Sequence, residues 1–263
     1  MAKRWESRDT VRFLVATIVL ISVIGVLYVI VEQEHVVWVW VFAMLAVAID
    51  LAFVGKGVTD VWYGVLVNDR NQISLSNLQV YLWFTVILSG WLFLALSNGT
   101  VNITVPEQVL GLLGISSVTT VAAVGINGQK KNAAPTPDTG EAVENQLEEV
   151  KKELPKDKEA VDRRGVLVTY NDPTKASLGN LFTGDEVGNH LSVDPGKVQM
   201  FFFTLLVAIA YAIQVGYWLA LPEPGTTLPD LSAGMVALLG ISHVGYLGTK
   251  YAPSTRTQDI IQP

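Results

Sequence analysis

The chain has 263 residues, of which 50% are hydrophobic and only 16% charged, with a formal net charge of −6. Soluble domains average about 25% charged residues, so this composition argues against an ordinary globular protein. The sequence contains no cysteine and only three scattered histidines, which excludes disulfides, thiolate metal sites and a histidine metal motif. Its negative charge is the opposite of a nucleic-acid-binding surface, and no cofactor motif is present.

Six apolar segments are long enough to cross a bilayer, which takes about 20 residues each. They are residues 11–31, 36–54, 78–96, 105–126, 198–221 and 231–251. The first is longer than the roughly 7–15-residue core of a cleavable signal peptide, so we expect it to remain as an anchor. If the N-terminus lies inside, all 18 Lys and Arg residues fall in the inner segments or the adjoining helix ends. The positive-inside rule therefore predicts an all-α, multi-pass protein of the cell membrane with both termini in the cytoplasm.

The last four predicted helices form an internal repeat of two hairpins. Residues 112–116 and 238–242 both read LLGIS, and both copies begin on the inner side, so the repeat is parallel. Small residues allow membrane helices to pack closely, which predicts that the fourth and sixth helices lie at the centre and that the third and fifth face lipid. The same faces predict a homo-oligomer. The residues expected to make these packing contacts are Gly114, Ser116, Gly240 and Ser242.

Five parts follow from this organisation. They are an N-terminal helix hairpin (1–73), the first repeat hairpin (74–126), a cytoplasmic insert (127–193), the second repeat hairpin (194–252) and a C-terminal tail (253–263). Three segments carry a resemblance: SLSNLQ at 74–79, LGIS in each hairpin, and LFTGDE at 181–186. Over residues 68–251 the chain resembles a family of uncharacterised prokaryotic multi-pass membrane proteins. That resemblance implies a membrane location and no particular activity or site residue.

The predicted cytoplasmic insert is polar and contains one helix-forming stretch. Residues 139–161 are rich in helix formers and carry an apolar stripe at Val143, Leu147, Val150 and Leu154. A solvated, charged helix is the favoured interpretation, and a coiled-coil element is the alternative. Residues 165–170 (GVLVTY) have the pattern of one strand, which is not stable alone.

Four side chains before the fifth span carry amide or carboxylate oxygens and form a weak cation-site candidate: Asp185, Glu186, Asn189 and Asp194. The calcium-loop spacing is absent. The simpler interpretation is that Asp194 caps the following helix, with Pro195 as its first residue.

Polar side chains within the predicted spans are the other candidates. Asp50 is the only acid inside a span, and ionisable residues in hydrocarbon are rare. A structural hydrogen bond near the inner boundary is as good an explanation for it as a conduction role. His243 could sense pH, although a hydrogen bond to a neighbouring helix is favoured. Interhelical hydrogen bonds are expected for Gln79, Gln199 and Gln214.

Two functions remain open on the sequence alone. The first is a homo-oligomeric, channel-like or transporter-like conduit for small ions, and the second is a membrane scaffold or signalling protein whose insert binds a cytoplasmic protein. No catalytic motif is found, so an enzyme is not expected. The bilayer itself is the expected partner, and nucleic acid is not.

Overall fold

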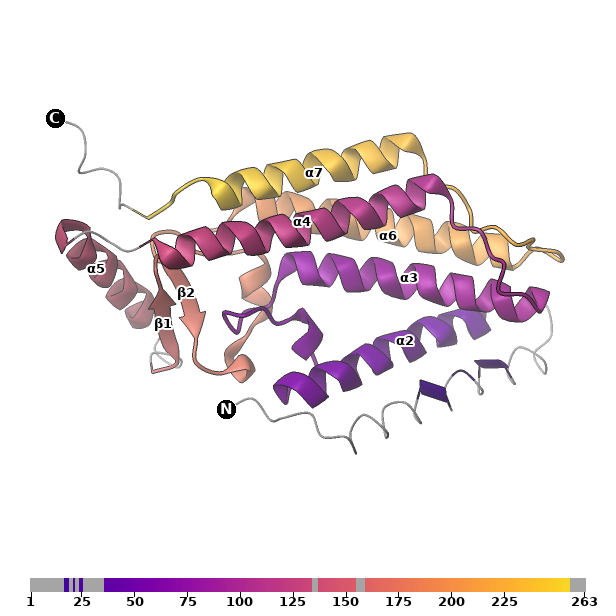
Figure 1. Cartoon of the computed structure of the whole chain (residues 1–263), viewed down its shortest axis with the longest axis horizontal. Coiled ribbons are helices and arrows are strands. Elements are labelled where there is room, and N and C mark those ends of the chain that lie inside the picture. Colours follow the sequence, from indigo (N-terminus) through magenta and orange to yellow (C-terminus); the bar gives the residue numbers. More distant parts are fainter. Residues whose placement is uncertain are drawn as a thin grey trace. The chain divides into compact units, whose positions relative to one another are not determined.

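The computed structural model describes residues 17–18, 21, 24–25, 36–133, 137–154 and 159–255. This part of the chain forms helices and one small antiparallel sheet (Figure 1). The helices are α2 (Val36–Thr59), α3 (Leu75–Asn98), α4 (Glu107–Asn132), α5 (Pro137–Glu153), α6 (Pro195–Leu219) and α7 (Ala233–Tyr251). The strands are β1 (Val161–Arg164) and β2 (Leu167–Tyr170). The fold is therefore mostly helical, and the prediction of a purely α-helical chain missed the sheet.

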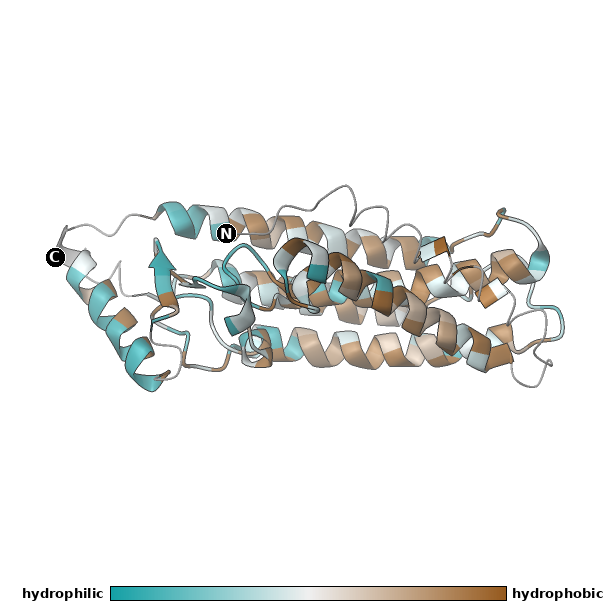
Figure 2. Cartoon of the chain, turned by 90° about the horizontal axis from the view of Figure 1, so that it is seen from below, coloured by the Kyte–Doolittle hydropathy of each residue, from teal (hydrophilic) through white to brown (hydrophobic). Residues whose placement is uncertain are grey.

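Within the described part of the chain, four helices are long and apolar enough to cross a membrane: α2, α3, α4 and α6. Figure 2 shows apolar residues along these helices and mainly polar residues on α5 and β1. The helices coincide with four of the predicted spans, so the structure supports a multi-pass membrane protein. The first predicted span (11–31) lies largely outside the described residues. Helix α7 covers the sixth, but it is not one of these four, and a count of six spans stays a prediction.

The chain divides into two compact units. Unit 1 consists of residues 1–65, 79–115 and 204–239, and unit 2 consists of residues 66–78, 116–203 and 240–263. Helices α3, α4, α6 and α7 each contribute residues to both units.

Aromatic side chains form the core of unit 1. The indole Nε1 of Trp40 in α2 donates to Ser89 Oγ in α3 at 3.1 Å. Trp83 in α3 is fully buried, and its ring centroid lies 6.2 Å from that of Tyr211 in α6. The Tyr211 hydroxyl donates to the carbonyl of Pro229 at 3.1 Å, which satisfies its polar end. The prediction that the third helix faces lipid is wrong for Trp83 and Phe93, which are buried, whereas Phe84 of the same helix is 43% exposed.

The small residues that allow close packing are not those predicted. A Cβ on Gly216 would lie 3.3 Å from the Trp40 ring, and one on Gly90 would lie 3.1 Å from Leu228. These glycines make room for bulky side chains in unit 1. A Cβ on Gly114 or Gly240 would meet nothing within 4 Å. The predicted packing role is therefore wrong for these two glycines within one chain.

The serines of the repeat behave differently from its glycines. Ser116 and Ser242 are 1% and 0% exposed. Around them, α4 nevertheless has an exposed apolar face formed by Val118, Val121 and Val124. The prediction that the fourth helix is central is thus wrong within one chain.

The insert of unit 2 is a folded subdomain. Strands β1 and β2 pair antiparallel, and the buried residues of α5 pack on them: Val143, Leu147 and Val150 contact a core with Val161, Val168, Tyr170 and Val187. The expectation of a solvated helix is wrong, because the apolar stripe is buried against the hairpin. The predicted helix also extended too far, since residue 161 already belongs to β1.

A tight turn joins the two strands at Gly165. Its φ is +61°, a left-handed conformation that glycine adopts at no steric cost. A Cβ here would also collide with the carbonyl oxygen of Lys130 at the end of α4. The neighbouring Val166 N–H donates to that same carbonyl. The glycine therefore lets the hairpin dock directly onto the end of α4.

Candidate functional site

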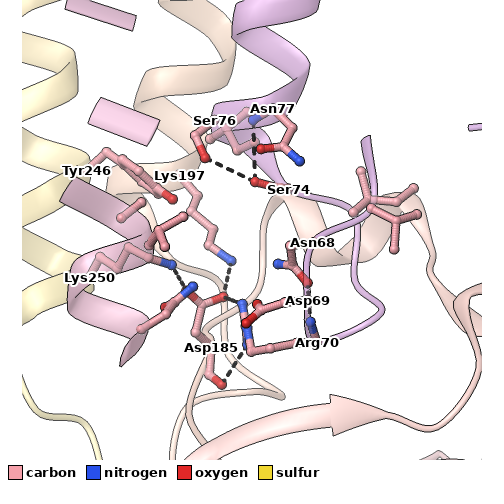
Figure 3. A pocket seen from close by; sticks show the side chains of 16 residues that line it. Asn68, Asp69, Arg70, Ser74, Ser76, Asn77, Asp185, Lys197, Tyr246 and Lys250 are labelled. Carbon is pink, nitrogen blue, oxygen red and sulfur yellow. Dashed lines mark hydrogen bonds and ion pairs between the residues drawn. The ribbon is translucent and has the colours of Figure 1, made fainter. Parts of the chain in front are cut away.

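One buried carboxylate in unit 2 binds three cations. Asp185 Oδ1 lies 2.7 Å from Arg70 Nη2 and 2.8 Å from Lys197 Nζ, and its Oδ2 pairs with Lys250 Nζ (Figure 3). The side chains of Asp185, Arg70, Lys197 and Lys250 are between 2% and 8% exposed. We call these four residues the Asp185 cluster. Ionic groups so buried need partners, because transfer from water is costly for each of them.

Local structure positions each member of the cluster. Arg70 lies in the loop between α2 and α3, where Asn68 Oδ1 accepts its backbone N–H at 2.9 Å. Its Nη1 donates to the carbonyls of Val168 and Asp185, both at 3.2 Å. Lys197 lies in the first turn of α6 and Lys250 in the last turn of α7. A basic residue at a helix C-terminus also interacts favourably with the helix dipole, as Lys250 does here.

The carboxylate of the next residue, Glu186, has partners of its own on both oxygens. Glu186 Oε1 lies 2.5 Å from Lys130 Nζ at the end of α4. Its Oε2 accepts the backbone N–H groups of Ser254 and Thr255 at 3.0 and 2.7 Å. Glu186 thus ties the insert to α4 and to the segment after α7. This pair is electrically balanced, unlike the Asp185 cluster.

The four residues of the predicted cation site have separate roles. Asp185 and Glu186 bind the cations described above. Asn189 Oδ1 accepts the Glu186 N–H, and Asn189 Nδ2 donates to Ser254 Oγ. Asp194 Oδ1 accepts the N–H groups at the start of α6, at 2.9 and 3.1 Å, which confirms its capping role. Among residues 36–133, 137–154 and 159–255, no group of three acidic or histidine side chains is arranged to hold a metal ion. The cation site is therefore not formed.

The environment of Asp185 keeps it ionised. Burial by itself raises the pKa of this carboxyl, but Arg70, Lys197 and Lys250 together outweigh burial and hold the pKa well below its ordinary value. Burial lowers the pKa of nearby His190 to about 4. The hydrogen bond to the Gly184 carbonyl opposes this shift, and the charges of Arg70 and Lys197 reinforce it. At neutral pH, His190 therefore adds no charge to the cluster.

The Asp185 cluster is not electrically neutral. With all three basic groups protonated, the four residues carry a formal net charge of +2, and Asp194 is a further carboxylate near Lys250. The neighbouring Lys130–Glu186 and Lys131–Asp69 pairs each balance themselves. Since uncompensated charge in a poorly solvated site is costly, the cluster favours an additional negative charge nearby.

A cavity of about 340 Å³ adjoins the cluster in unit 2. Its polar lining includes Arg70, Lys250 and Asn127, together with residues at the start of α3 (Figure 3). Arg70 Nε and Asn127 Oδ1 are buried and have no hydrogen-bond partner among the described residues. Within the same part of the chain, the ammonium of Lys250 donates to one acceptor, although it has three N–H groups. Unused hydrogen-bonding groups therefore line the cavity where the charge excess lies.

The polar residues predicted within spans have ordinary partners. The Asp50 carboxylate is hydrogen-bonded to the Thr17 side chain and lines a largely apolar cavity of unit 1. His243 Nδ1 in α7 lies 2.6 Å from Thr119 Oγ1 in α4, which confirms the favoured interhelical bond.

The three glutamines differ from one another. Gln79 in α3 donates to Thr204 in α6, which confirms the predicted interhelical bond. Gln214 donates to the carbonyl of Asp230, which lies in the loop before α7, at 3.0 Å. The Gln199 side chain lies against Gly245 of α7, where a Cβ would be 3.7 Å from its Oε1.

Sequence reasoning missed the cationic members of the cluster. The positive-inside rule treats Arg70, Lys197 and Lys250 as solvated charges that set the membrane orientation. The sequence holds one signal that could have separated them. Lys197 and Lys250 are each embedded in the end of an apolar helix, whereas the exposed lysines of α5 stand among other charges. For Arg70 we find no such signal.

Comparison with known proteins yields no relative. No family model matches the chain, and neither the curated proteins nor the solved structures include a significant match. Its function must therefore be inferred from the site.

The low pKa of His190 predicts acid sensitivity. In the unfolded chain the imidazole binds a proton near pH 6.5, whereas in the folded protein it does so only near pH 4. The folded state thus loses up to about 3 kcal/mol as the pH falls across this window. Replacing His190 by Gln should flatten this part of the stability profile, measured by thermal unfolding in detergent. Asp185 contributes only below its ordinary pKa of 3.8, so a profile unchanged by His190→Gln above pH 4 would contradict the assignment.

Proposed function

We propose that this membrane protein binds an anion in the cavity of unit 2. The observation that carries the proposal is the formal net charge of +2 in the Asp185 cluster, beside the buried and unpartnered donor Arg70 Nε. A bound anion would neutralise the excess charge and accept hydrogen bonds from Arg70 Nε and the remaining Lys250 N–H groups. Hydrogen bonds between charged groups are stronger than neutral ones, so this pairing provides affinity as well as orientation.

The start of α3 supports the same ligand. Ser76 and Asn77 line the cavity in the first turn of this helix, whose dipole is positive at that end. Ser76 is hydrogen-bonded to Tyr246, which also lines the cavity. A helix N-terminus is a weak anion site by itself, but here it faces the same cavity as the buried cations.

Anion-dependent stability tests the proposal. The full chain in detergent is heated with increasing inorganic phosphate, sulfate or a short-chain phosphatidic acid at constant ionic strength. Binding to the folded state should raise the unfolding temperature with ligand concentration for at least one of the three. Lys250→Gln should weaken this response by about tenfold or more, because it removes a charged donor.

Lys56→Gln is the matched control. Lys56 is a half-exposed lysine of α2 that pairs with Asp60, and both residues lie outside unit 2. This variant should keep the anion response of the unmodified protein. No response to any of the three anions, or an equal response in Lys250→Gln, would overturn the proposal.

An ion conduit is the second candidate function. The observation that favours it is a set of polar residues buried in α4 and α7. Ser116, Thr119, Ser242 and His243 are all 2% exposed or less. Such residues in an apolar environment are costly and mark ion pathways in many membrane proteins. The other alternative, a scaffold, loses one possible contact surface because the apolar stripe of α5 is already covered by the hairpin.

Flux measurements on reconstituted liposomes test the conduit. Asp50→Asn removes a charge and His243→Gln removes a titratable group, each with little change in volume. If ions pass through the protein, at least one variant should alter the flux or its pH dependence while remaining folded. Flux no greater than in empty liposomes, over several ions and pH values, would exclude the conduit.

A further inference from the structure

We infer that the anion bound beside the Asp185 cluster is the phosphate of a membrane lipid headgroup. This inference rests on the proposed anion site and names the class of its ligand. The group that the site would recognise is a phosphoryl group, which a lipid headgroup and free phosphate both carry. The cavity lining distinguishes the two sources.

The cavity is lined by residues of two kinds. Arg70, Lys197 and Lys250 of the cluster are charged. Leu75 at the start of α3 and Val124 on α4 are apolar. A small inorganic ion makes no use of apolar walls, whereas a headgroup attached to glycerol and acyl chains presents both kinds of surface. The volume of about 340 Å³ falls within the range of small-molecule sites, roughly 300–1,000 Å³.

The cavity also lies where α4 changes from apolar to polar. Val124 is 65% exposed and continues the exposed apolar face of α4, a candidate membrane span. Asn127 follows about one helical turn later, and Lys130 follows Asn127 by another turn. Both Val124 and Asn127 line the cavity. The transition from an apolar face to amide and basic residues marks the level of lipid headgroups, so the site is accessible from the membrane.

The charge of a headgroup phosphate matches the cluster. A phosphodiester carries one negative charge and a phosphomonoester about one and a half to two at neutral pH. Either compensates part or all of the +2 of the cluster. Proteins commonly bind phosphate through the guanidinium of arginine and the ammonium of lysine, which Arg70 and Lys250 provide here.

Lipid binding to the full chain can be measured by native mass spectrometry after release from detergent, together with unfolding temperature. The probes are phosphatidic acid, phosphatidylglycerol, zwitterionic phosphatidylcholine, oleate and inorganic phosphate. The two anionic phospholipids should bind and stabilise more than the other three. Lys250→Gln should weaken their binding by about tenfold or more, and Lys56→Gln should not.

Asn127→Asp provides a variant that breaks no ion pair of the cluster. It places a carboxylate at the cavity lining with almost no change in shape. The added negative charge should repel the phosphate and reduce phospholipid binding, so the inference stays testable if Lys250→Gln fails to fold. Equal binding of anionic phospholipids to Asn127→Asp, Lys250→Gln and the unmodified protein would show adsorption to the outer surface and overturn the inference.

The probes separate this inference from the proposed function. Stabilisation by inorganic phosphate equal to that by phospholipid would keep the anion site and overturn the lipid assignment. Oleate binding as strong as that of phosphatidic acid would overturn the role of the phosphate. Equal binding of phosphatidylcholine would overturn recognition of net charge. If no probe binds or stabilises, both the inference and the proposed function fail.

Discussion

Asp185→Asn should greatly reduce the yield of folded protein. The change preserves shape but removes the one negative charge among Arg70, Lys197 and Lys250, all nearly buried. An amide presents an acceptor on one side only, so its NH₂ group would face a cation on the other. Leaving buried charges unpaired costs about 3–5 kcal/mol, which is a large share of the roughly 5–15 kcal/mol that stabilises a typical protein. The measurement is the yield of monodisperse protein in detergent and its unfolding temperature.

Two further variants make this result specific. Asp162→Asn removes an exposed carboxylate from β1 and should leave the yield unchanged. Adding Lys250→Met to Asp185→Asn removes one unpaired cation, so the double variant should recover part of the lost stability. If Asp185→Asn is as stable as Asp162→Asn, the cluster is not what holds these segments together.

Leu147→Ala should destabilise the folded structure of the insert. Leu147 is 2% exposed and lies in the core formed by α5 and the hairpin. Truncating a buried leucine costs about 2–5 kcal/mol, because contacts are lost and a void remains. A small subdomain has few other core residues to compensate. Limited digestion with trypsin should therefore cut the variant rapidly within the insert, at basic residues such as Lys151, Lys152 and Arg163.

Asn145→Ala is the control for the insert. Asn145 is exposed on α5, close in sequence to the buried Leu147 but on a different face of the helix. Its replacement by alanine, a stronger helix former, should leave the digestion rate unchanged or lower it. Equal digestion of Leu147→Ala and Asn145→Ala would mean that α5 does not depend on the hairpin for its stability.

Hydropathy made the long helices predictable because a membrane span is a local property of about 20 consecutive residues. The four helices α2, α3, α4 and α6 follow the predicted segments closely. The apolar stripe of α5 was also visible, but its partner was not. Strand β1 has the sequence VDRR, and three of its four residues are charged, which hides it from any search for an apolar strand.

The cluster could not be predicted because its members are distant in the sequence. Arg70 and Asp185 are 115 residues apart, and Asp185 and Lys250 are 65 apart. No spacing rule links residues from a loop, an insert and two helices. The same is true of the packing glycines. Gly216 is a contact residue because Trp40 lies against it, whereas Gly114 also lies in an apolar helix and meets nothing.

The position of Lys250 has a consequence for synthesis of the chain. A ribosome delivers Arg70, Asp185 and Lys197 first, and Lys250, the third cation of the cluster, only after α6 and most of α7 have been made. The backbone N–H groups of Ser254 and Thr255 that bind Glu186 come later still. Until these residues leave the ribosome, the insert cannot complete its attachment to α7. A nascent chain arrested before residue 250 would thus present an incompletely anchored insert to the proteases and chaperones that inspect unfinished membrane proteins.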